Sequence, residues 1–373
     1  MARNTKRKVR RRGRRKKRGF ASWSFGKKIG AVLGGTFLAV AVIGMVILAS
    51  KMNKLKSVKL NTDKLNISDE VQHEEGYTNV ALFGLDSREN DLGKGNRSDT
   101  IMIASLNNDT KEVKLVSIYR DTLLELDDGS YNKANAAYAF GGPEGAVSLI
   151  NRNLDMNIEK YVTVNFNALV DVIDAVGGLD LELTHDEVVH MNNYCVETSK
   201  VTGKKYKKIE PAVAGTYKLN GVQAVSYARI RYTAGGDYKR TERQRLVLKK
   251  TADKLKQQDL ATLNKIIDKV MPEVSTSFTT KEILSLATGA FDYELGETTG
   301  FPFDLETPEQ IPGYSGSYVV PKGLEENVIK LHQFLYPNKD YTPTATVTDI
   351  SNTLNDMTNV YPNTTESGTS QNE

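Results

Sequence analysis

An uncharged apolar run from Ile29 to Ala49 constrains this chain more than any other feature of its sequence. At about 1.5 Å of rise per residue, its 21 residues can cross a hydrocarbon core of roughly 30 Å as a helix. The residues after it, Ser50 and Lys51, make a poor match to the small-residue cleavage site of a secretory signal. We therefore expect a retained transmembrane anchor over residues 29–49.

The flank that precedes this run indicates its orientation. Residues 1–28 contain fourteen Lys or Arg and no acidic residue. Basic segments next to a membrane span stay in the cytoplasm, so the chain from Lys51 onward should lie outside the membrane. The sequence predicts a single-pass protein of the cell membrane with a cytoplasmic N-terminus and an extracytoplasmic domain.

The net charge of the exported part differs from that of the whole chain. The whole chain has a net charge of +4, but without the fourteen N-terminal positives 36 basic residues face 46 acidic ones, a formal charge of −10. Nucleic-acid-binding domains carry an extended basic face, so no nucleic acid partner is expected. Anionic lipid headgroups are the nearer partner of the basic tail. Cys195 is the only cysteine, and the lack of any disulfide suits a bacterial cell surface.

The remainder divides into three parts by composition. Residues 50–76 are polar and weakly patterned, and we interpret them as a stalk. Residues 77–340 have the length of one α/β domain. Residues 341–373 are rich in Thr, Asn and Ser and poor in large apolar side chains, so a disordered tail is expected there.

Strand and helix patterns alternate along the central part. The periodicity of apolar residues predicts strands at residues 79–85, 100–106, 113–118, 161–164 and 179–183. Helices are expected at residues 133–140, 143–153, 166–176, 241–257, 260–271, 281–291 and 323–335, with Asn165 as a cap. A turn at residues 107–109 would join two of the strands as a hairpin. The expected fold is α/β, a mixed central sheet with helices on both faces.

Two carboxylates flank the first two predicted strands. Asp86 follows the strand at 79–85, and Asp99 precedes the strand at 100–106. If those strands are neighbours, both carboxylates lie at one sheet edge, where open α/β sheets bind ligands. Two carboxylates with phosphate oxygens form a common Mg²⁺ site. Simple turn and capping roles would account for the same spacing.

An arginine-rich stretch from Tyr227 to Arg245 is the strongest indication of a binding site. Arg229 and Arg231 alternate at the strand period, so on an extended segment both would share one face. Arg240 and Gln244 are four residues apart and would share a helix face after the turn at residues 235–236. Arginine forks grip phosphate groups bidentately, which favours a cradle for a polyanion. A solvated basic helix beginning near Thr241 is the alternative.

Two more basic residues lie next to predicted secondary-structure elements. Arg120 ends the strand at 113–118, and Lys133 opens a helix. An ion pair of Arg120 with Asp121 at the surface and an ordinary helix start are the simpler explanations. The sequence contains no Walker A, zincin or G-x-S-x-G signature, which disfavours nucleotide, zinc and serine-hydrolase chemistry.

The ordered set of these motifs resembles the LytR-CpsA-Psr family of bacterial cell-wall ligases. The matching residues are Asp86, Arg97 to Thr100, Arg120 to Thr122, Lys133 to Ala137, Gly141 to Pro143, Val176 to Gly178 and Arg229 to Gln244. The resemblance covers roughly residues 80–245 and the membrane-anchored layout. It departs at Tyr119, where the family commonly has proline.

The resemblance implies a Mg²⁺-dependent (or Mn²⁺-dependent) phosphotransferase. It would move a glycopolymer, such as teichoic acid or capsule, from a polyprenyl pyrophosphate carrier to a peptidoglycan hydroxyl. By the family match, Asp86 and Asp99 would hold the metal, and Asp237, Arg120 and Arg231 would be catalytic, with Asp237 orienting arginines and serving as one candidate base. The pyrophosphate would be held by Arg97, Arg120, Lys133, Arg229, Arg231, Arg240 and Gln244.

The polyprenyl tail needs an apolar tunnel, for which the helices at 146–154 and 166–176 are candidates. A hydrolase of polyprenyl pyrophosphate would use the same site with water as acceptor. A membrane-bound transcriptional regulator would need residues 1–28 to read DNA, yet they hold no helix-turn-helix signal. A non-catalytic polymer-binding protein is a further alternative.

Overall fold

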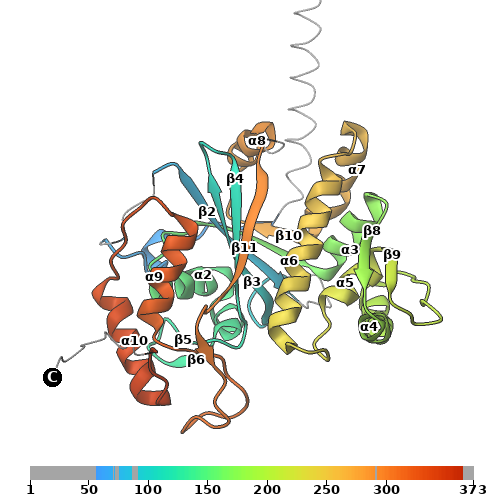
Figure 1. Cartoon of the computed structure of the whole chain (residues 1–373). Helices are drawn as coiled ribbons and strands as arrows, with labels where there is room; N and C mark the ends of the chain where they lie inside the picture. The colour runs from blue at the N-terminus through green and yellow to red at the C-terminus, as the bar shows by residue number, and fades with distance from the viewer. Residues whose placement is uncertain (1–55, 70, 72–74, 86–90, 290–291, 364–373) are drawn as a thin grey trace, which may run out of the picture. The chain divides into compact units, whose positions relative to one another are not determined.

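The computed structural model describes residues 56–69, 71, 75–85, 91–289 and 292–363 (Figure 1). The chain divides into the units Met1–Ser50 and Lys51–Glu373, and every described residue belongs to the second unit. Within the described ranges no helix is both long and apolar enough to span a membrane. The expected anchor at 29–49 and the basic tail at 1–28 lie outside them.

A seven-stranded mixed sheet organises the described part of the chain. Its strand order is β1-β10-β7-β2-β3-β4-β11. The strands are β1 (Lys56–Ser57), β2 (Tyr77–Leu85), β3 (Ser98–Asn107), β4 (Glu112–Ile118), β7 (Lys160–Asn165), β10 (Val274–Thr276) and β11 (Glu294–Phe301). β2, β3 and β4 form an antiparallel meander, whereas β7 pairs with β2, and β11 with β4, in parallel. The predicted mixed sheet and its hairpin are confirmed.

Helices cover both faces of this sheet. The helices of the described residues are α2 (Ala134–Leu154), α3 (Phe166–Ala175), α4 (His185–Thr202), α5 (Gly221–Ala228), α6 (Gly236–Leu255), α7 (Leu260–Val270), α8 (Thr280–Gly289), α9 (Leu324–Leu335) and α10 (Ala345–Thr358), with short 3-10 turns η2 (Thr62–Lys64) and η3 (Met271–Glu273). Phe83 and Leu85 of β2 are buried in one core with α2, α9 and α10. Leu82 and Gly84 face a cavity that α3 and α6 cover. Side chains alternate along β2, so this strand contributes to the core on one face of the sheet and to the cavity on the other.

Local sequence signals fix where these helices begin and break. α2 runs through both predicted segments and kinks between them at Gly142, whose φ of 66° and ψ of −154° are not helical. Pro143, which has no N–H to donate, then starts the second segment. Asn165 caps α3 as predicted, because its side chain accepts a hydrogen bond from the Ala168 N–H.

The predicted strand at 179–183 lies outside the central sheet. It forms β8 (Leu179–Leu183), which pairs with β9 (Gly215–Leu219) in a separate two-stranded sheet. A second core of buried residues joins this pair to α3, α4 and α5. The sequence patterns did not predict α4, which begins with a capping box between Thr184 and Glu187. Two further short pairs are β5 (Leu123–Glu125) with β6 (Tyr131–Lys133), and β12 (Leu305–Glu306) with β13 (Val320–Pro321).

The stalk interpretation of residues 50–76 is wrong for the part that the structure describes. β1 pairs in parallel with β10 at the sheet edge. Leu65 is fully buried in the main core, and its carbonyl accepts a hydrogen bond from Asn151 Nδ2 at 2.9 Å. A few well-spaced apolar side chains were enough to dock this polar segment.

The expectation of a disordered tail from residue 341 is also wrong over the described residues. α10 packs Val347, Ile350 and Leu354 into the main core. Asp155, at the end of α2, accepts hydrogen bonds from the Tyr341 hydroxyl at 2.6 Å and from the N–H and hydroxyl of Thr344. An amphipathic helix of modest apolar content was hidden by its Thr and Asn residues. Residues 364–373 lie outside the described ranges.

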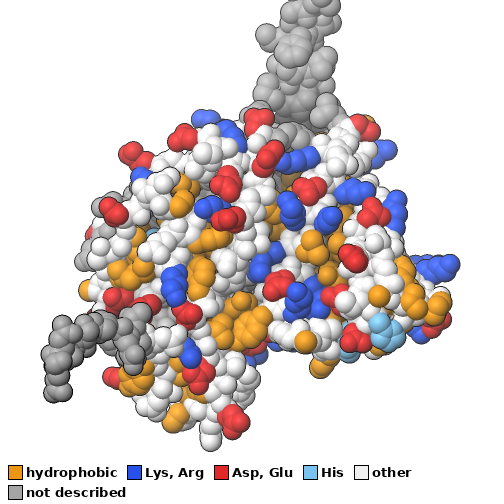
Figure 2. All heavy atoms as spheres, in the orientation of Figure 1, with side chains coloured by type: hydrophobic (Ala, Val, Ile, Leu, Met, Phe, Trp, Pro, Cys, Tyr) orange, Lys and Arg blue, Asp and Glu red, His pale blue; other side chains and the backbone are white. Residues whose placement is uncertain are grey.

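Charges of both signs are interspersed over the face of the molecule seen in Figure 2. Lys and Arg side chains alternate there with Asp and Glu side chains, and orange apolar groups lie between them. The arginines that concern function are gathered in a cavity, which is described next.

Candidate functional site

A charged cavity of about 300 Å³ collects most of the predicted arginines. Its lining residues are Asp99, Arg120, Phe166, Tyr194, Glu197, Arg229, Arg231, Arg240 and Gln244. Four guanidinium groups thus face two carboxylates, an excess of positive charge suited to a polyanion.

The route by which Arg229 and Arg231 reach the cavity differs from the prediction. They do not lie on a strand, because α5 ends at Ala228 and Arg229 is its C-cap in a helical conformation. Asn220 and Gln223 form a capping box that starts α5, so the run before the arginines is helical and their alternation was misleading. The turn at 235–236 is confirmed: Gly235 has a φ of 87°, and α6 begins after it.

The edge shared by β2, β3 and β4 brings Asp99 and Arg120 together. Asp99 Oδ1 lies 2.5 Å from Arg120 Nη1, and its Oδ2 lies 3.7 Å from Arg231 Nη2. β2 and β3 are neighbours as the carboxylate hypothesis required, with Leu85 opposite Ser98. Asp86 itself lies outside the described residues.

Arg240 is the most deeply buried cation of the site. Its side chain is 2% exposed, and Nη2 donates to Asp237 Oδ2 at 2.8 Å. Its Nε and Nη1 find no hydrogen-bond partner within the described part of the chain. Burial lowers the pKa of Arg240 to about 10, so the group stays charged at neutral pH. A buried cation with two unused donors strongly favours an anionic oxygen as ligand.

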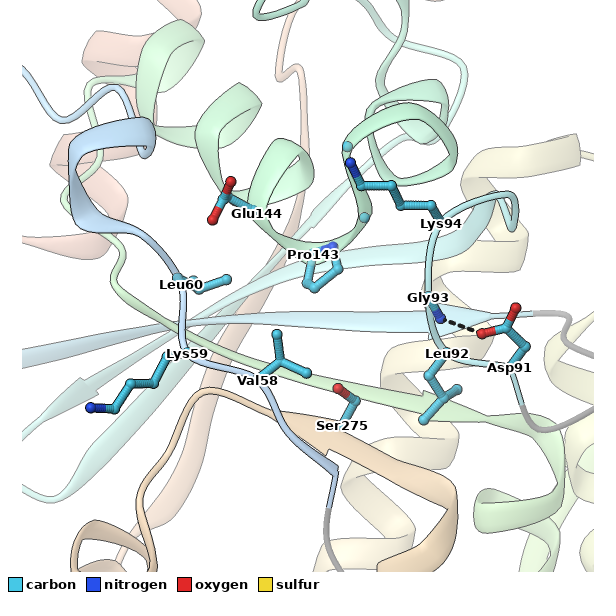
Figure 3. Close-up of a pocket in the computed structure, with 12 residues that line it drawn as sticks. Val58, Lys59, Leu60, Asp91, Leu92, Gly93, Lys94, Pro143, Glu144 and Ser275 are labelled. Carbon is cyan, nitrogen blue, oxygen red and sulfur yellow. Dashed lines mark hydrogen bonds between the residues drawn. The ribbon is translucent and has the colours of Figure 1, made fainter.

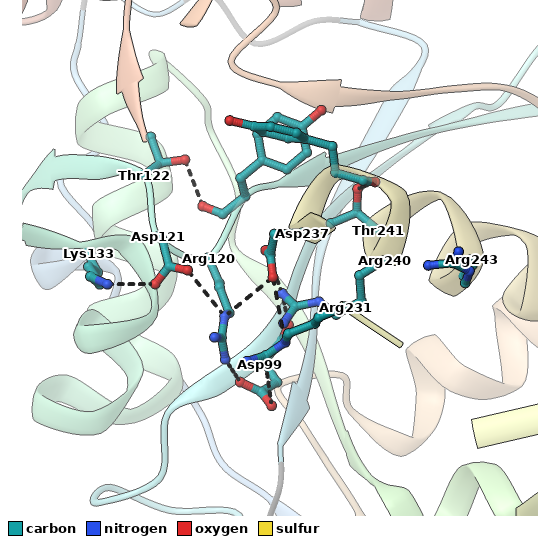
Figure 4. Close-up of polar contacts among 12 residues, drawn as sticks. Asp99, Arg120, Asp121, Thr122, Lys133, Arg231, Asp237, Arg240, Thr241 and Arg243 are labelled. Carbon is teal, nitrogen blue, oxygen red and sulfur yellow. Dashed lines mark hydrogen bonds and ion pairs between the residues drawn. The ribbon is translucent and has the colours of Figure 1, made fainter. Parts of the chain in front are cut away.

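Asp237 holds the guanidinium groups in place (Figure 4). Besides Arg240, it lies 3.7 Å from Arg231 Nε and 3.9 Å from Arg120 Nε. Burial opposes charge on Arg120, yet the nearby carboxylates of Asp99, Asp121 and Asp237 raise its pKa. This geometry agrees with an arginine-orienting role for Asp237.

Two predicted phosphate ligands do not line the cavity. Lys133 Nζ lies 3.0 Å from Asp121 Oδ1 and 4.9 Å above the Tyr318 ring. Asp121 in turn approaches Arg120 Nε at 3.5 Å, so Asp121 connects Lys133 to the site. Arg97 is exposed and is absent from the lining.

A divalent metal needs several oxygen ligands close together, and the described residues supply only part of such a set. They contain no group of three or more His, Cys, Asp or Glu side chains placed to hold an ion. Asp99 offers carboxylate oxygens at the cavity wall, and the register of β2 and β3 brings the end of β2 to the same edge. Mg²⁺ is commonly bound by one or two carboxylates plus substrate phosphates, and this arrangement fits that donor set.

Three lining residues were missed at the sequence level. Phe166 starts α3, while Tyr194 and Glu197 lie three apart on α4. The Arg229 guanidinium lies 4.7 Å from the Phe166 ring and 3.1 Å from Glu197 Oε2. Only the unpredicted α4 could have indicated the last two, because their sequence spacing carries no motif.

An apolar cavity of about 240 Å³ adjoins the charged one. Its lining residues are Leu82, Phe83, Gly84, Thr100, Met102, Val162, Val164, Asn165, Phe166, Leu169, Ala228, Gln244, Val247 and Leu248. Phe166 and Gln244 line both cavities. Of the two helices expected beside an apolar tunnel, the one at 166–176 contributes and the one at 146–154 does not.

A larger cavity of about 400 Å³ lies at the kink of α2 (Figure 3). Lys59, Lys94, Asp91 and Glu144 give it balanced charge, and Val58, Leu60 and Leu92 give it apolar walls. It contains no arginine, and its residues are not among those that the phosphate hypothesis uses. Size alone therefore does not identify the functional site.

The chain is similar to several known proteins. The family model described as LytR_cpsA_psr family matches residues 42–296. The chain is 30% identical over 271 residues to the polyisoprenyl-teichoic acid–peptidoglycan teichoic acid transferase TagV of Bacillus subtilis (strain 168), covering 67% of this chain and 62% of TagV. It is also 29% identical to the polyisoprenyl-teichoic acid–peptidoglycan teichoic acid transferase TagU of Enterococcus faecalis (strain ATCC 700802 / V583). This match covers 71% of this chain and 84% of TagU.

A solved structure supports the fold. The LytR-CPS2A-psr family protein YwtF (TagT) with bound octaprenyl pyrophosphate lipid superposes with a TM-score of 0.53 at 22% identity, covering 74% of this chain and 99% of that one. The match of the family model over more than half of the sequence shows the membership directly. The chain belongs to the LytR-CpsA-Psr family.

Proposed function

We propose that this protein is an extracytoplasmic phosphotransferase that attaches an anionic glycopolymer, such as teichoic acid or capsule, to peptidoglycan. The donor would be the polymer linked to a polyprenyl pyrophosphate. One observation carries the proposal: a cavity with four arginines adjoins an apolar cavity, and Phe166 and Gln244 line both. A molecule with a pyrophosphate head and a hydrocarbon tail has this pair of chemistries. TagV and TagU, by their names, transfer teichoic acid from polyisoprenyl carriers.

The reaction needs positioning and charge neutralisation more than a covalent nucleophile. An acceptor hydroxyl of peptidoglycan attacks the phosphorus that bears the glycan, and the bond from that phosphorus to the bridging oxygen breaks. Polyprenyl phosphate leaves, and the hydroxyl proton passes to a base, for which Asp237 is the candidate. Arg120, Arg231 and Arg240 stabilise the negative charge that develops on the phosphate oxygens.

A divalent cation belongs to the same proposal. Asp99, together with Asp86, would hold Mg²⁺ or Mn²⁺ against the pyrophosphate, and the ion would supply further neutralisation of charge. Arg229 and Gln244, which line the cavity, would complete the grip. Lys133, which pairs with Asp121, would act through that carboxylate.

The location follows from the sequence layout. The basic residues 1–28 and the apolar run at 29–49 would anchor the protein in the cell membrane, with the catalytic domain outside. A lipid-linked donor and a wall acceptor are both found there.

Complementation tests the proposal. Full-length Arg231→Ala and Asp99→Ala proteins, expressed in a strain without its own ligases, should leave the wall without covalently bound polymer. Lys249→Ala, an exposed change on α6, should restore attachment as the parent does. Wild-type attachment by either site variant would show that the site is assigned wrongly.

The purified protein separates transfer from hydrolysis. With lipid-linked polymer, a transferase releases polyprenyl phosphate only when the peptidoglycan acceptor is present. Equal release without acceptor would identify a hydrolase that uses water on the same site.

A further inference from the structure

Three aromatic side chains cluster beside the arginine cavity. His190 and Tyr194 are four residues apart on one face of α4, and Tyr232 follows Arg231 in the loop before α6. The ring centroids of Tyr194 and Tyr232 are 6.4 Å apart with an interplanar angle of 28°. Those of His190 and Tyr232 are 6.1 Å apart with an angle of 35°. These angles are far from a T-shaped arrangement, and the exposure of Tyr232 leaves much of its ring surface open to solvent.

The group leads from the cavity wall to solvent. Tyr194 lines the cavity, and its ring lies 5.8 Å from the Arg229 guanidinium. Tyr232 is 75% exposed, the largest exposed fraction among the large apolar side chains of the described residues. None of the three rings lines the apolar cavity. The rings therefore continue the charged cavity outward and do not extend the lipid-sized one.

A buried arginine fixes the two elements that carry these rings. Arg243, on α6, lies 2.9 Å from Glu187 Oε1 of α4. Its other nitrogens donate to the Ile230 carbonyl at 3.2 Å and to the Thr233 hydroxyl at 2.7 Å, on either side of Tyr232. The loop is thus held at both ends, and the exposed ring is presented by a tied backbone.

We propose that His190, Tyr194 and Tyr232 form a stacking platform for the sugar rings of the donor that are joined to the pyrophosphate. One face of a pyranose is lined by C–H bonds, and this face packs on aromatic ring faces while its hydroxyls remain in water. Tyr194 lines the same cavity as Arg229 and Arg231, so a sugar attached to a pyrophosphate held there would lie next to the rings. The inference rests on the proposed function and adds the residues that would contact the glycan next to the phosphates.

Binding of two matched lipids tests the platform. The full-length protein in detergent is titrated with a polyprenyl pyrophosphate that carries a disaccharide and with the same lipid pyrophosphate without sugar. Tyr232→Ala should raise the Kd of the glycosylated lipid about five- to tenfold and leave that of the bare lipid unchanged. Tyr232→Phe, which keeps the ring, should stay within about twofold of the parent. Tyr361→Ala removes another exposed tyrosine and should change neither Kd.

Other outcomes would overturn the platform. Equal weakening of both lipids would mean that Tyr232 serves the pyrophosphate or the fold, and unchanged binding would mean that it serves neither. A raised KM for peptidoglycan with unchanged donor binding would assign the rings to the acceptor. If the parent protein binds neither lipid, the proposed function fails together with the platform, and this result is distinguishable because it appears before any variant is made.

Discussion

Arg240 is a buried arginine that still has hydrogen-bond donors available for a ligand. Its guanidinium is buried, with one nitrogen on Asp237 and two without a partner among the described residues. Leaving buried donors unused costs free energy, which an incoming phosphate oxygen would recover on binding. The destabilisation is concentrated where the ligand would bind, as is common for functional sites.

Replacing this arginine with lysine should weaken binding of phosphate. Arg240→Lys keeps a positive charge but loses the planar fork and two donors, and burial favours the neutral amine. We expect the Kd for inorganic pyrophosphate, measured by calorimetry, to rise about 10- to 100-fold.

Arg245→Lys is the matched control for this change. Arg245 lies on the same helix and is also buried, but it does not line the cavity. The Arg245→Lys variant should bind inorganic pyrophosphate with a Kd within about twofold of the parent. A similar loss in both variants would show that the effect comes from the stability of α6 and not from the site.

α9 packs against the C-terminal segment through two aromatic rings. His332 of α9 stacks on Tyr341, with ring centroids 3.7 Å apart, and its Nε2 lies 3.0 Å from the Leu154 carbonyl. A carbonyl only accepts, so Nε2 carries the proton and Nδ1 is the unprotonated nitrogen. Nδ1 is buried without a hydrogen-bond partner in the described part of the chain, and burial lowers the pKa of His332.

Acid should therefore loosen this contact. The unfolded chain takes up a proton at His332 near pH 6.5, whereas the folded state takes it up only at lower pH. The unfolded state thus binds more protons in this window, and the free energy of unfolding should fall as the pH drops below about 6.5.

Denaturation of the parent and of His332→Gln between about pH 7.5 and 5 measures the contribution. The glutamine amide can still donate to Leu154 but does not titrate, so the variant should lose less stability over this range. Identical pH profiles for the two proteins would contradict a neutral buried His332.

Two adjoining cavities determine which parts of the donor the protein would bind. The charged cavity would fix the pyrophosphate, and the apolar cavity beneath α3 and α6 would take the first part of the lipid. The hydrophobic effect is roughly proportional to the apolar area buried, so affinity should grow with tail length until the cavity is full.

A series of prenyl pyrophosphates tests this coupling. Inorganic pyrophosphate is the member of the series without a tail. Each isoprene unit that is added and enters the cavity should lower the Kd at least about tenfold. Leu169→Trp fills the apolar cavity and should abolish the dependence on chain length while binding inorganic pyrophosphate like the parent. Leu246→Trp, an exposed position on α6 outside the cavity, should keep the dependence. Full dependence in Leu169→Trp would show that the tail binds elsewhere.

Sequence patterns succeeded where the signal is local. The apolar strands at 79–85 and 113–118, the Gly-Pro break in α2 and the Asn165 cap are properties of short segments, and the structure confirms each. They failed where burial depends on distant partners. α4 and α10 have diluted apolar stripes, and each became a helix of the core because other elements cover that stripe.

Short stretches of chain hold the periodicity, the caps and the ordered motifs that predicted the class of fold and the family. The tertiary structure fixed which charges meet. It placed Asp99, Arg120, Arg231 and Arg240 around one cavity, left Arg97 and Lys133 outside its lining, and added Tyr194 and Glu197 from α4. The reason is physical: a guanidinium acquires its role from burial and from neighbours within a few ångströms, and those neighbours come from strands and helices that lie far apart in the sequence.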